Sequence, residues 1–252
     1  MTHVFQKYYL QVISLVLISC FSAEVLAQNH RKTIRIHSLA NFPFSTNDSI
    51  YEITPVYKKY AYDTTQEIAY TSKHVATKDM LENFSVGTYL FSLSKPNHLP
   101  ETKLPLHIIH DEIYQIVYTK NTGYLGHLEE LLNIPFVLSP EFLSEYGHQT
   151  DLRVATDCAE LAIYGKRKQG MKVPYCGLRG ITKYMQKTSV IKKGIILHFG
   201  HQVSVLYEDR GIPNVIDGDD LLIHAYKLKA EIIPLKETNL HNTPYITYQW
   251  KQ

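Results

Sequence analysis

Cysteine is scarce in this sequence, and its scarcity narrows the class of protein. The 252 residues include three cysteines, too few for a small domain held together by disulfides. No Cys-x-x-Cys or His-x-x-x-His pair occurs, so we expect no metal site. We also expect no cofactor, and each cysteine has to be interpreted from its own surroundings.

Positive and negative charges are nearly balanced in the chain, and no apolar run is long. The formal net charge is +2, and no block of like charges occurs, so we expect no nucleic-acid partner. Tyrosine, by contrast, is abundant at 19 residues. Because aromatic side chains suit half-buried strands, this abundance favours a β-rich protein.

The first 27 residues have the pattern of a cleavable export signal. Lys7 precedes an apolar stretch, residues 10–21, which is short of the roughly 20 apolar residues of a membrane-spanning helix. Val25-Leu26-Ala27 then fits a cleavage site before Gln28. The sequence therefore predicts an exported protein that acts in the periplasm or outside the cell.

A second interpretation of the same segment stays open. Leu17-Ile18-Ser19-Cys20 resembles the lipobox of bacterial lipoproteins, in which the cysteine carries a lipid and becomes the first mature residue. Under this alternative the protein is anchored in the envelope, and we expect membrane contact only if Cys20 is lipidated.

The pattern of the remaining chain predicts an α+β protein in two parts. Residues 30–120 contain short alternating runs, such as residues 86–93, separated by turn residues, and predict an antiparallel β sandwich. Residues 121–150 have helical apolar spacing and predict a helical linker, with one short helix beginning at Ser139-Pro140. Residues 151–252 predict a helix followed by strands.

Cys158 is the residue with the clearest chemical potential. Thr156-Asp157 can cap a helix that has Lys166, Arg167 and Lys168 near its end and stops at Gly170. Cys158 would then lie in the first turn, where unpaired amides and the helix dipole lower a thiol pKa and favour the nucleophilic thiolate. The alternatives are a small buried apolar residue or one half of a disulfide with Cys176.

A cysteine nucleophile needs a histidine base, which the fold rather than the sequence places beside it. Among 13 histidines, His201 stands at the head of a predicted strand, residues 202–207, and His224 ends the run at residues 221–223. We therefore consider His201 as the base and His224 as the group that orients it.

Four segments together resemble the NlpC-type papain-like cell-wall cysteine peptidases. They occur in the family's order, and the resemblance covers about residues 151–235: Asp157-Cys158-Ala159-Glu160-Leu161, then Lys193-Gly194-Ile195-Ile196-Leu197-His198-Phe199, then Gly200-His201-Gln202-Val203-Ser204-Val205-Leu206-Tyr207, and Leu222-Ile223-His224-Ala225. One residue is inserted after His201, and Ile195 stands where the family usually has aspartate.

The resemblance implies a papain-like domain that hydrolyses an amide bond with Cys158, His201 and His224. It also implies a substrate, the stem or cross-bridge peptides of peptidoglycan or another envelope amide. Two alternatives remain. In a transglutaminase-like arrangement Asp217 would orient His201, although Asp217-Gly218-Asp219-Asp220 also fits a polar turn. In the other, the protein is a catalytically inactive binding or structural protein of the envelope.

Overall fold

The computed structural model describes residues 32–57 and 67–251. The predicted export signal, with both Ala27 and Cys20, lies outside the described residues. Among the described residues, no helix is both long and apolar enough to cross a bilayer.

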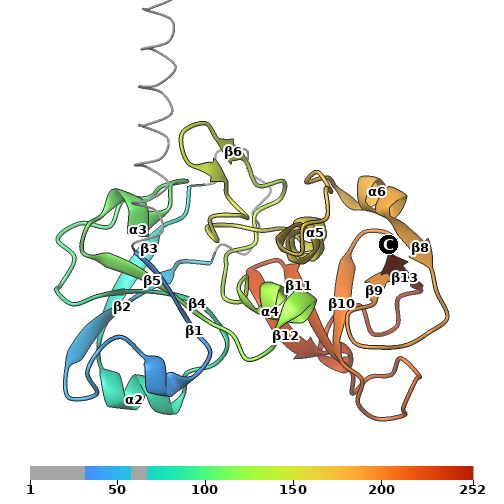
Figure 1. The fold of residues 1–252 in the computed structure, drawn as a ribbon, viewed down its shortest axis with the longest axis horizontal. Helices are drawn as coiled ribbons and strands as arrows, with labels where there is room; N and C mark the ends of the chain where they lie inside the picture. The colour runs from blue at the N-terminus through green and yellow to red at the C-terminus, as the bar shows by residue number, and fades with distance from the viewer. Residues whose placement is uncertain (1–31, 58–66, 252) are drawn as a thin grey trace, which may run out of the picture.

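The described chain contains both helices and sheets, so the predicted α+β class is confirmed. Its strands form a five-stranded sheet, a six-stranded sheet and a two-stranded hairpin. Figure 1 shows the N-terminal sheet on one side and the C-terminal sheet on the other, with the helices α4 (Gly123–Glu129) and α5 (Cys158–Lys168) between them.

The N-terminal part is one sheet, and the predicted sandwich of two sheets is wrong for the described residues. The strand order is β1-β5-β4-β2-β3, and β1 pairs with β5 in parallel. The strands are β1 (Thr33–Ile36), β2 (Ser49–Pro55), β3 (Tyr70–Ala76), β4 (Gly87–Ser92) and β5 (Ile113–Tyr118). Alternating runs predict strands with one buried face, but they do not say what covers that face.

Aromatic side chains from connecting segments cover one face of this sheet in place of a second sheet. The Phe42 ring packs edge-to-face against Phe91 of β4, and the Phe84 ring packs against Phe91 at a tilt. Phe42 follows the short helix η1 (Leu39–Asn41), and Phe84 follows α2 (Thr77–Glu82). The other face holds a smaller cluster with Leu106 of α3 (Leu106–Ile109).

The predicted helical linker is helical only at its beginning. After α4 the chain forms the hairpin β6 (Phe142–Leu143) and β7 (Gly147–His148). The helix expected from Ser139-Pro140 is therefore absent from the described residues, because Phe142 pairs with His148 instead. Contacts across the chain override the local preference here.

The C-terminal part is a six-stranded antiparallel sheet. Its order is β12-β11-β10-β9-β13-β8. The strands are β8 (Met185–Lys187), β9 (Ile196–His198), β10 (Val203–Glu208), β11 (Leu221–Tyr226), β12 (Lys229–Pro234) and β13 (Ile246–Trp250). Three short helices complete this part: α6 (Leu178–Ile181), η2 (Thr182–Tyr184) and η3 (Leu235–Glu237).

Helix α5 packs on one face of this sheet, and its start and end agree with the sequence. The Asp157 carboxylate accepts a hydrogen bond from the Glu160 amide at 2.8 Å and caps the helix. Gly170 follows the helix with a φ of +87°, a conformation that glycine adopts without strain. The apolar side of α5 joins Val203, Val205 and Ile223 of the sheet in one core.

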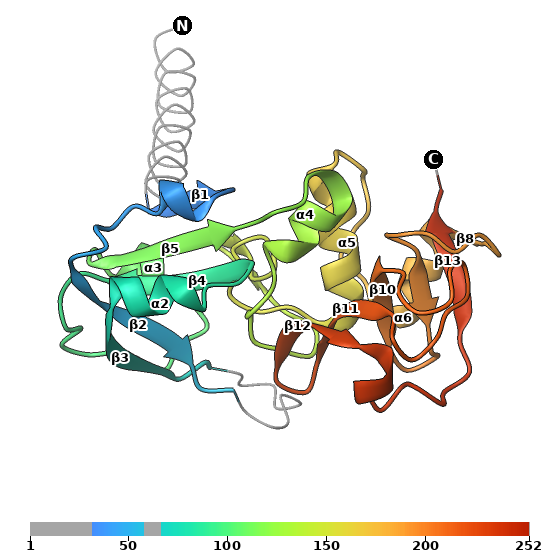
Figure 2. The ribbon, with the colours of Figure 1, turned by 90° about the horizontal axis from the view of Figure 1, so that it is seen from below.

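Polar contacts join the two sheets across the middle of the molecule. Arg153 donates from Nε to Gln115 Oε1 of β5 at 2.9 Å. The Tyr164 hydroxyl of α5 donates to Glu130 Oε2 at 2.9 Å, and Arg35 of β1 pairs with the same carboxylate at 3.1 Å. These contacts hold the N-terminal sheet against the helix that carries Cys158. Figure 2 shows the ribbon of that sheet and of α5 from below.

Candidate active site

Cys158 is the first residue of α5, as the sequence predicts. Its side chain is 8% exposed and lines a cavity of about 550 Å³. One wall of the cavity comes from Gly177 and from Leu178, the first residue of α6. Cys158 is therefore buried in the core on one side and reaches an open space on the other.

His201 lines the same cavity, so the structure brings together the two main candidates for catalysis. It lies between β9 and β10, two residues before Val203, which belongs to the core under α5. The His201 side chain is exposed. No described residue, Cys158 included, is hydrogen-bonded to the His201 ring. Cys158 and His201 therefore line the same cavity but do not contact each other through a hydrogen bond.

The Cys158 thiol is not the low-pKa group that its place in the helix predicts. Burial, followed by the charge of the Asp157 carboxyl, raises its pKa to about 12. Backbone amides of Val203, Ala159 and Cys158 act in the opposite direction. The amides of the helix start are present as expected, but desolvation outweighs them, and the thiol is protonated at neutral pH.

The Asp157 carboxyl makes the surroundings of the thiol unfavourable for another negative charge, and Glu160 is buried beside Asp157. Asp157 accepts hydrogen bonds from the Glu160 amide and from the Ser139 amide, the latter at 3.3 Å, and burial raises its pKa. Burial and the neighbouring Asp157 raise the pKa of Glu160 to about 8. The Thr150 hydroxyl donates to Glu160 Oε2 at 2.6 Å. The sequence shows that Asp157 and Glu160 are present, but only the fold shows that both side chains are buried.

His224 does not join Cys158 and His201. It lies on β11 between Ile223 and Ala225, which both belong to the core under α5. Because side chains alternate along a strand, His224 points to the opposite face of the sheet. It is 3% exposed and lines a different cavity. The sequence predicts His224 as the group that orients His201, whereas the structure places it on the opposite face of the sheet from the core under α5.

Asp217 lies in the loop between β10 and β11 and organises that loop. Its carboxylate accepts hydrogen bonds from the amides of Ile212 at 2.7 Å and Asp219 at 2.9 Å, and these bonds lower its pKa. Asp220 in turn accepts from the amide of Asp217 at 2.9 Å. The structure thus agrees with the polar-turn interpretation, and Asp217 does not line the cavity that holds His201.

Cys176 and Cys158 are both free thiols in the structure. Cys176 is half-buried and packs against Gly180, where an added Cβ would lie 2.8 Å from the cysteine Cβ. The nucleophile candidate is therefore not tied up by the disulfide that the sequence leaves open.

Three residues of the cavity were not among the candidates taken from the sequence. Gln202 is 2% exposed and donates from Nε2 to the Ala225 carbonyl at 3.0 Å, which ties the start of β10 to β11. Tyr226 and the exposed Arg179 line the cavity as well. Gln202 follows His201 directly, at the place where the resembled motif has one residue fewer. This inserted residue was the feature of the sequence that could have pointed to Gln202.

Within residues 32–57 and 67–251, no group of three His, Cys, Asp or Glu side chains is arranged to hold a metal ion. The acidic loop at residues 209–220 uses its carboxylates on its own backbone amides, for example Asp209 on the Asn214 amide at 3.0 Å.

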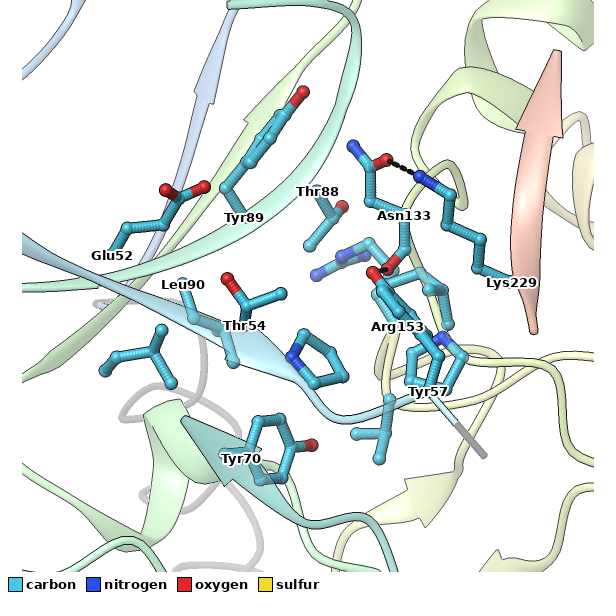
Figure 3. Close-up of a pocket in the computed structure, with 15 residues that line it drawn as sticks. Glu52, Thr54, Tyr57, Tyr70, Thr88, Tyr89, Leu90, Asn133, Arg153 and Lys229 are labelled. Carbon is cyan, nitrogen blue, oxygen red and sulfur yellow. Dashed lines mark hydrogen bonds between the residues drawn. The ribbon is translucent and has the colours of Figure 1, made fainter. Parts of the chain in front are cut away.

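A second cavity, of about 210 Å³, lies between the two parts of the molecule (Figure 3). Tyr57 donates to the Asn133 carbonyl at 2.8 Å, and Lys229 donates to Asn133 Oδ1 at 3.4 Å. Its polar lining also includes Glu52, Thr54, Thr88, Arg153 and the tyrosines Tyr70 and Tyr89. Cys158 and His201 do not line this cavity.

Comparison of the chain with protein-family models, with curated proteins and with solved structures gives no match. The functional argument therefore depends on the geometry of the site and on the motif resemblance.

Proposed function

We propose that this protein is an exported cysteine hydrolase that cleaves an amide bond in peptidoglycan stem or cross-bridge peptides or in another envelope amide. The observation that carries the proposal is the shared cavity of Cys158 and His201 at the start of a helix. A helix with a cysteine at its first residue, packed on an antiparallel sheet with a histidine at a strand start, is also the arrangement expected of a papain-like domain.

In the proposed mechanism Cys158 attacks the amide carbonyl and forms a thioester. Because the thiol is protonated at neutral pH, its proton passes to His201 as the carbon–sulfur bond forms. His201 then returns the proton to the leaving amine, and water attacks the thioester to release the acid and restore the thiol. Amides at the start of α5 stabilise the oxyanion.

The proposed catalytic pair has no orienting third member among the described residues. His224 lies on the other face of the sheet, and Asp217 is held in its loop. The proposed chemistry uses Cys158 and His201 and needs neither the NlpC-type triad nor a transglutaminase-like Cys-His-Asp set, whereas the proposed substrate comes from the motif resemblance.

A second candidate function is an envelope binding protein without turnover. The raised pKa of the Cys158 thiol, near two buried carboxyl groups, favours it. The two candidates differ in a single readout, which is the release of new peptide ends from the wall.

The test is incubation of purified protein with purified peptidoglycan, followed by mass spectrometry of released peptides. Wild type is compared with Cys158→Ala and with the matched control Cys176→Ala. The hydrolase proposal expects product from wild type and Cys176→Ala and none from Cys158→Ala. Equal product profiles from all three proteins would reject it.

Export itself is part of the proposal, and the mature N-terminus tests it. Cleavage after Ala27 gives a chain that begins at Gln28, whereas the lipobox alternative gives an acylated Cys20. Mass spectrometry of the protein isolated from its own cells distinguishes the two, and an intact Met1 in the purified protein contradicts both.

A further inference from the structure

A separate cavity of about 430 Å³ lies on the sheet face that α5 leaves uncovered. Its floor is formed by neighbouring pairs of β11 and β12, in which His224 pairs with Glu231 and Tyr226 pairs with Lys229. Glu237 and Asn239, in and after η3, form its side. These residues share one face of two paired strands, so the cavity has a fixed floor.

His224 is a buried side chain whose ring lies within ion-pair distance of Glu231 but has no hydrogen-bond partner in the part of the chain that the structure describes. Its side chain is 4% exposed, and Nε2 lies 3.7 Å from the Glu231 carboxylate, beyond hydrogen-bond distance. Neither ring nitrogen has a hydrogen-bond partner among the described residues. Such a group costs stability unless something pairs with it, and this indicates that the cavity is built to receive a polar ligand.

Ser204 extends this row of unpaired polar groups across a third strand. Val205 of β10 pairs with Ile223 of β11, so Ser204 stands next to His224 on the same face. Its hydroxyl is also buried and has no partner among the described residues. Ser204, His224 and Glu231 thus form a polar row that leads to the cavity.

The charges around the cavity are balanced and of both signs. Lys227 and Lys229 contribute two ammonium groups, and Glu231 and Glu237 contribute two carboxylates. The His224 ring and Lys229 lower the pKa of the Glu231 carboxyl, which is therefore ionised at neutral pH. A ligand with one charge alone would leave half of these groups without a complement.

The cavity adjoins the proposed active site on one side and the cavity between the two parts on the other. Tyr226 lines both this cavity and the one that holds Cys158. Tyr57 and Lys229 line both this cavity and the inter-sheet cavity, where Figure 3 shows Lys229 extending toward Asn133. Tyr226, the last residue of β11, is thus the residue that the two cavities have in common.

We propose that the cavity floored by His224, Tyr226, Lys229 and Glu231 is a second binding site, which takes a zwitterionic peptide segment bearing one amino group and one carboxylate. The inference rests on the proposed function in one respect, because this segment belongs to the same substrate whose amide reaches Cys158. Glu231 binds the amino group, Lys229 binds the carboxylate, and His224 hydrogen-bonds the peptide backbone between them.

The test is calorimetric binding of synthetic peptides to the full chain carrying Cys158→Ala, which prevents turnover. The probe is an N-acetylated tetrapeptide with a lysine at its third position and a free C-terminal carboxylate. Acetylating the lysine or amidating the C-terminus is expected to weaken binding at least tenfold. Glu231→Gln should remove the effect of acetylation, and Lys229→Gln should remove the effect of amidation, as groups in direct contact do in a double-mutant cycle.

Two exposed pairs supply matched controls. Lys236→Gln changes a lysine that pairs with Asp219, and Glu208→Gln changes a glutamate that pairs with Arg210. Both controls should bind the peptides as the parent protein does. Affinity that is unaffected by either peptide modification, or equal losses in the controls and the cavity variants, would overturn the second site.

Wild-type turnover of the same peptides separates this inference from the proposed function. Charge-dependent binding without Cys158-dependent cleavage would retain the second site and reject the hydrolase. Cys158-dependent cleavage with the same KM for all three peptides would retain the hydrolase and reject the second site.

Discussion

His201 and His224 are found in opposite settings, although both are histidines in the sheet region that follows α5. His201 is exposed at a strand start and shares a cavity with Cys158. His224 is buried in a strand interior, on the other face, beside Glu231. The difference arises because successive side chains along a strand point to opposite faces of the sheet, so a shift of one residue changes the face.

The same comparison applies to charge. The space around Cys158 adjoins two buried carboxyl groups with raised pKa values, so it resists a further negative charge. The space around His224 has ammonium groups and carboxylates together. The Cys158 cavity thus suits an uncharged amide bond, and the His224 cavity suits the charged groups of a ligand.

The largest expected effect separates the two histidines by kinetics. His201→Ala should lower kcat by about 10²- to 10⁴-fold, because it removes the proton acceptor. His224→Gln should keep kcat within about threefold and raise KM, because it removes a binding group only. Steady-state kinetics on a released-peptide assay measures both, with unfolding curves as a check on folding. A fall in kcat for His224→Gln as large as that for His201→Ala would restore His224 as a triad member.

The next prediction concerns the charge beside the thiol. Asp157→Asn should lower the pKa of Cys158 by removing a negative charge, while asparagine still caps α5. Iodoacetamide labelling of Cys158 at pH 7 should then become about three- to tenfold faster, as measured by peptide mass spectrometry.

The matched control for that experiment is Asp111→Asn, the same change at an exposed aspartate that pairs with Lys32. It should leave the labelling rate of Cys158 unchanged. An unchanged rate in Asp157→Asn as well would mean that burial alone raises the thiol pKa.

The third prediction concerns stability as a function of pH. The pKa of Glu160 is raised to about 8 in the folded protein, so its contribution is complete at pH below its unfolded value and is lost as pH rises through 8. Wild type should therefore lose stability relative to Glu160→Gln between pH 5 and pH 9, by roughly 4 kcal/mol. Denaturant unfolding at both pH values measures the difference, and parallel losses in the two proteins would contradict it.

The smallest effect on activity is expected at Asp217. Asp217→Asn weakens the hydrogen bonds to the Ile212 and Asp219 amides and should cost about 1 kcal/mol of stability. Its kcat should equal that of wild type, because the residue does not line the Cys158 cavity. A loss of kcat without a loss of stability would favour the transglutaminase-like alternative.

Features that depend on neighbouring residues were predictable from the sequence. The Asp157 cap, the helix from Cys158 to Lys168 and the strand of residues 203–208 follow from capping chemistry and from periodicity. The position of Cys158 at a helix start follows for the same reason.

Features that depend on distant residues were not predictable. The second sheet expected in residues 30–120 is replaced by aromatic loops, since a strand pattern does not specify its cover. The raised pKa of Cys158 depends on burial that only the folded core creates. The face of the sheet on which His224 lies can be named only once it is known which face α5 covers. The residues around His224 do not predict which face that is.

The position of β13 has a consequence for the order in which this protein can form. Residues 246–250 lie between β9 and β8 and pair with both, for example Tyr248 with Ile196 and with Lys187. As the chain emerges from the ribosome, β8 has no partner in this sheet until Trp250 has been made. The six-stranded sheet is therefore completed only after synthesis has passed that point, and a chain stalled before it exposes two unpaired strand edges to the chaperones around it.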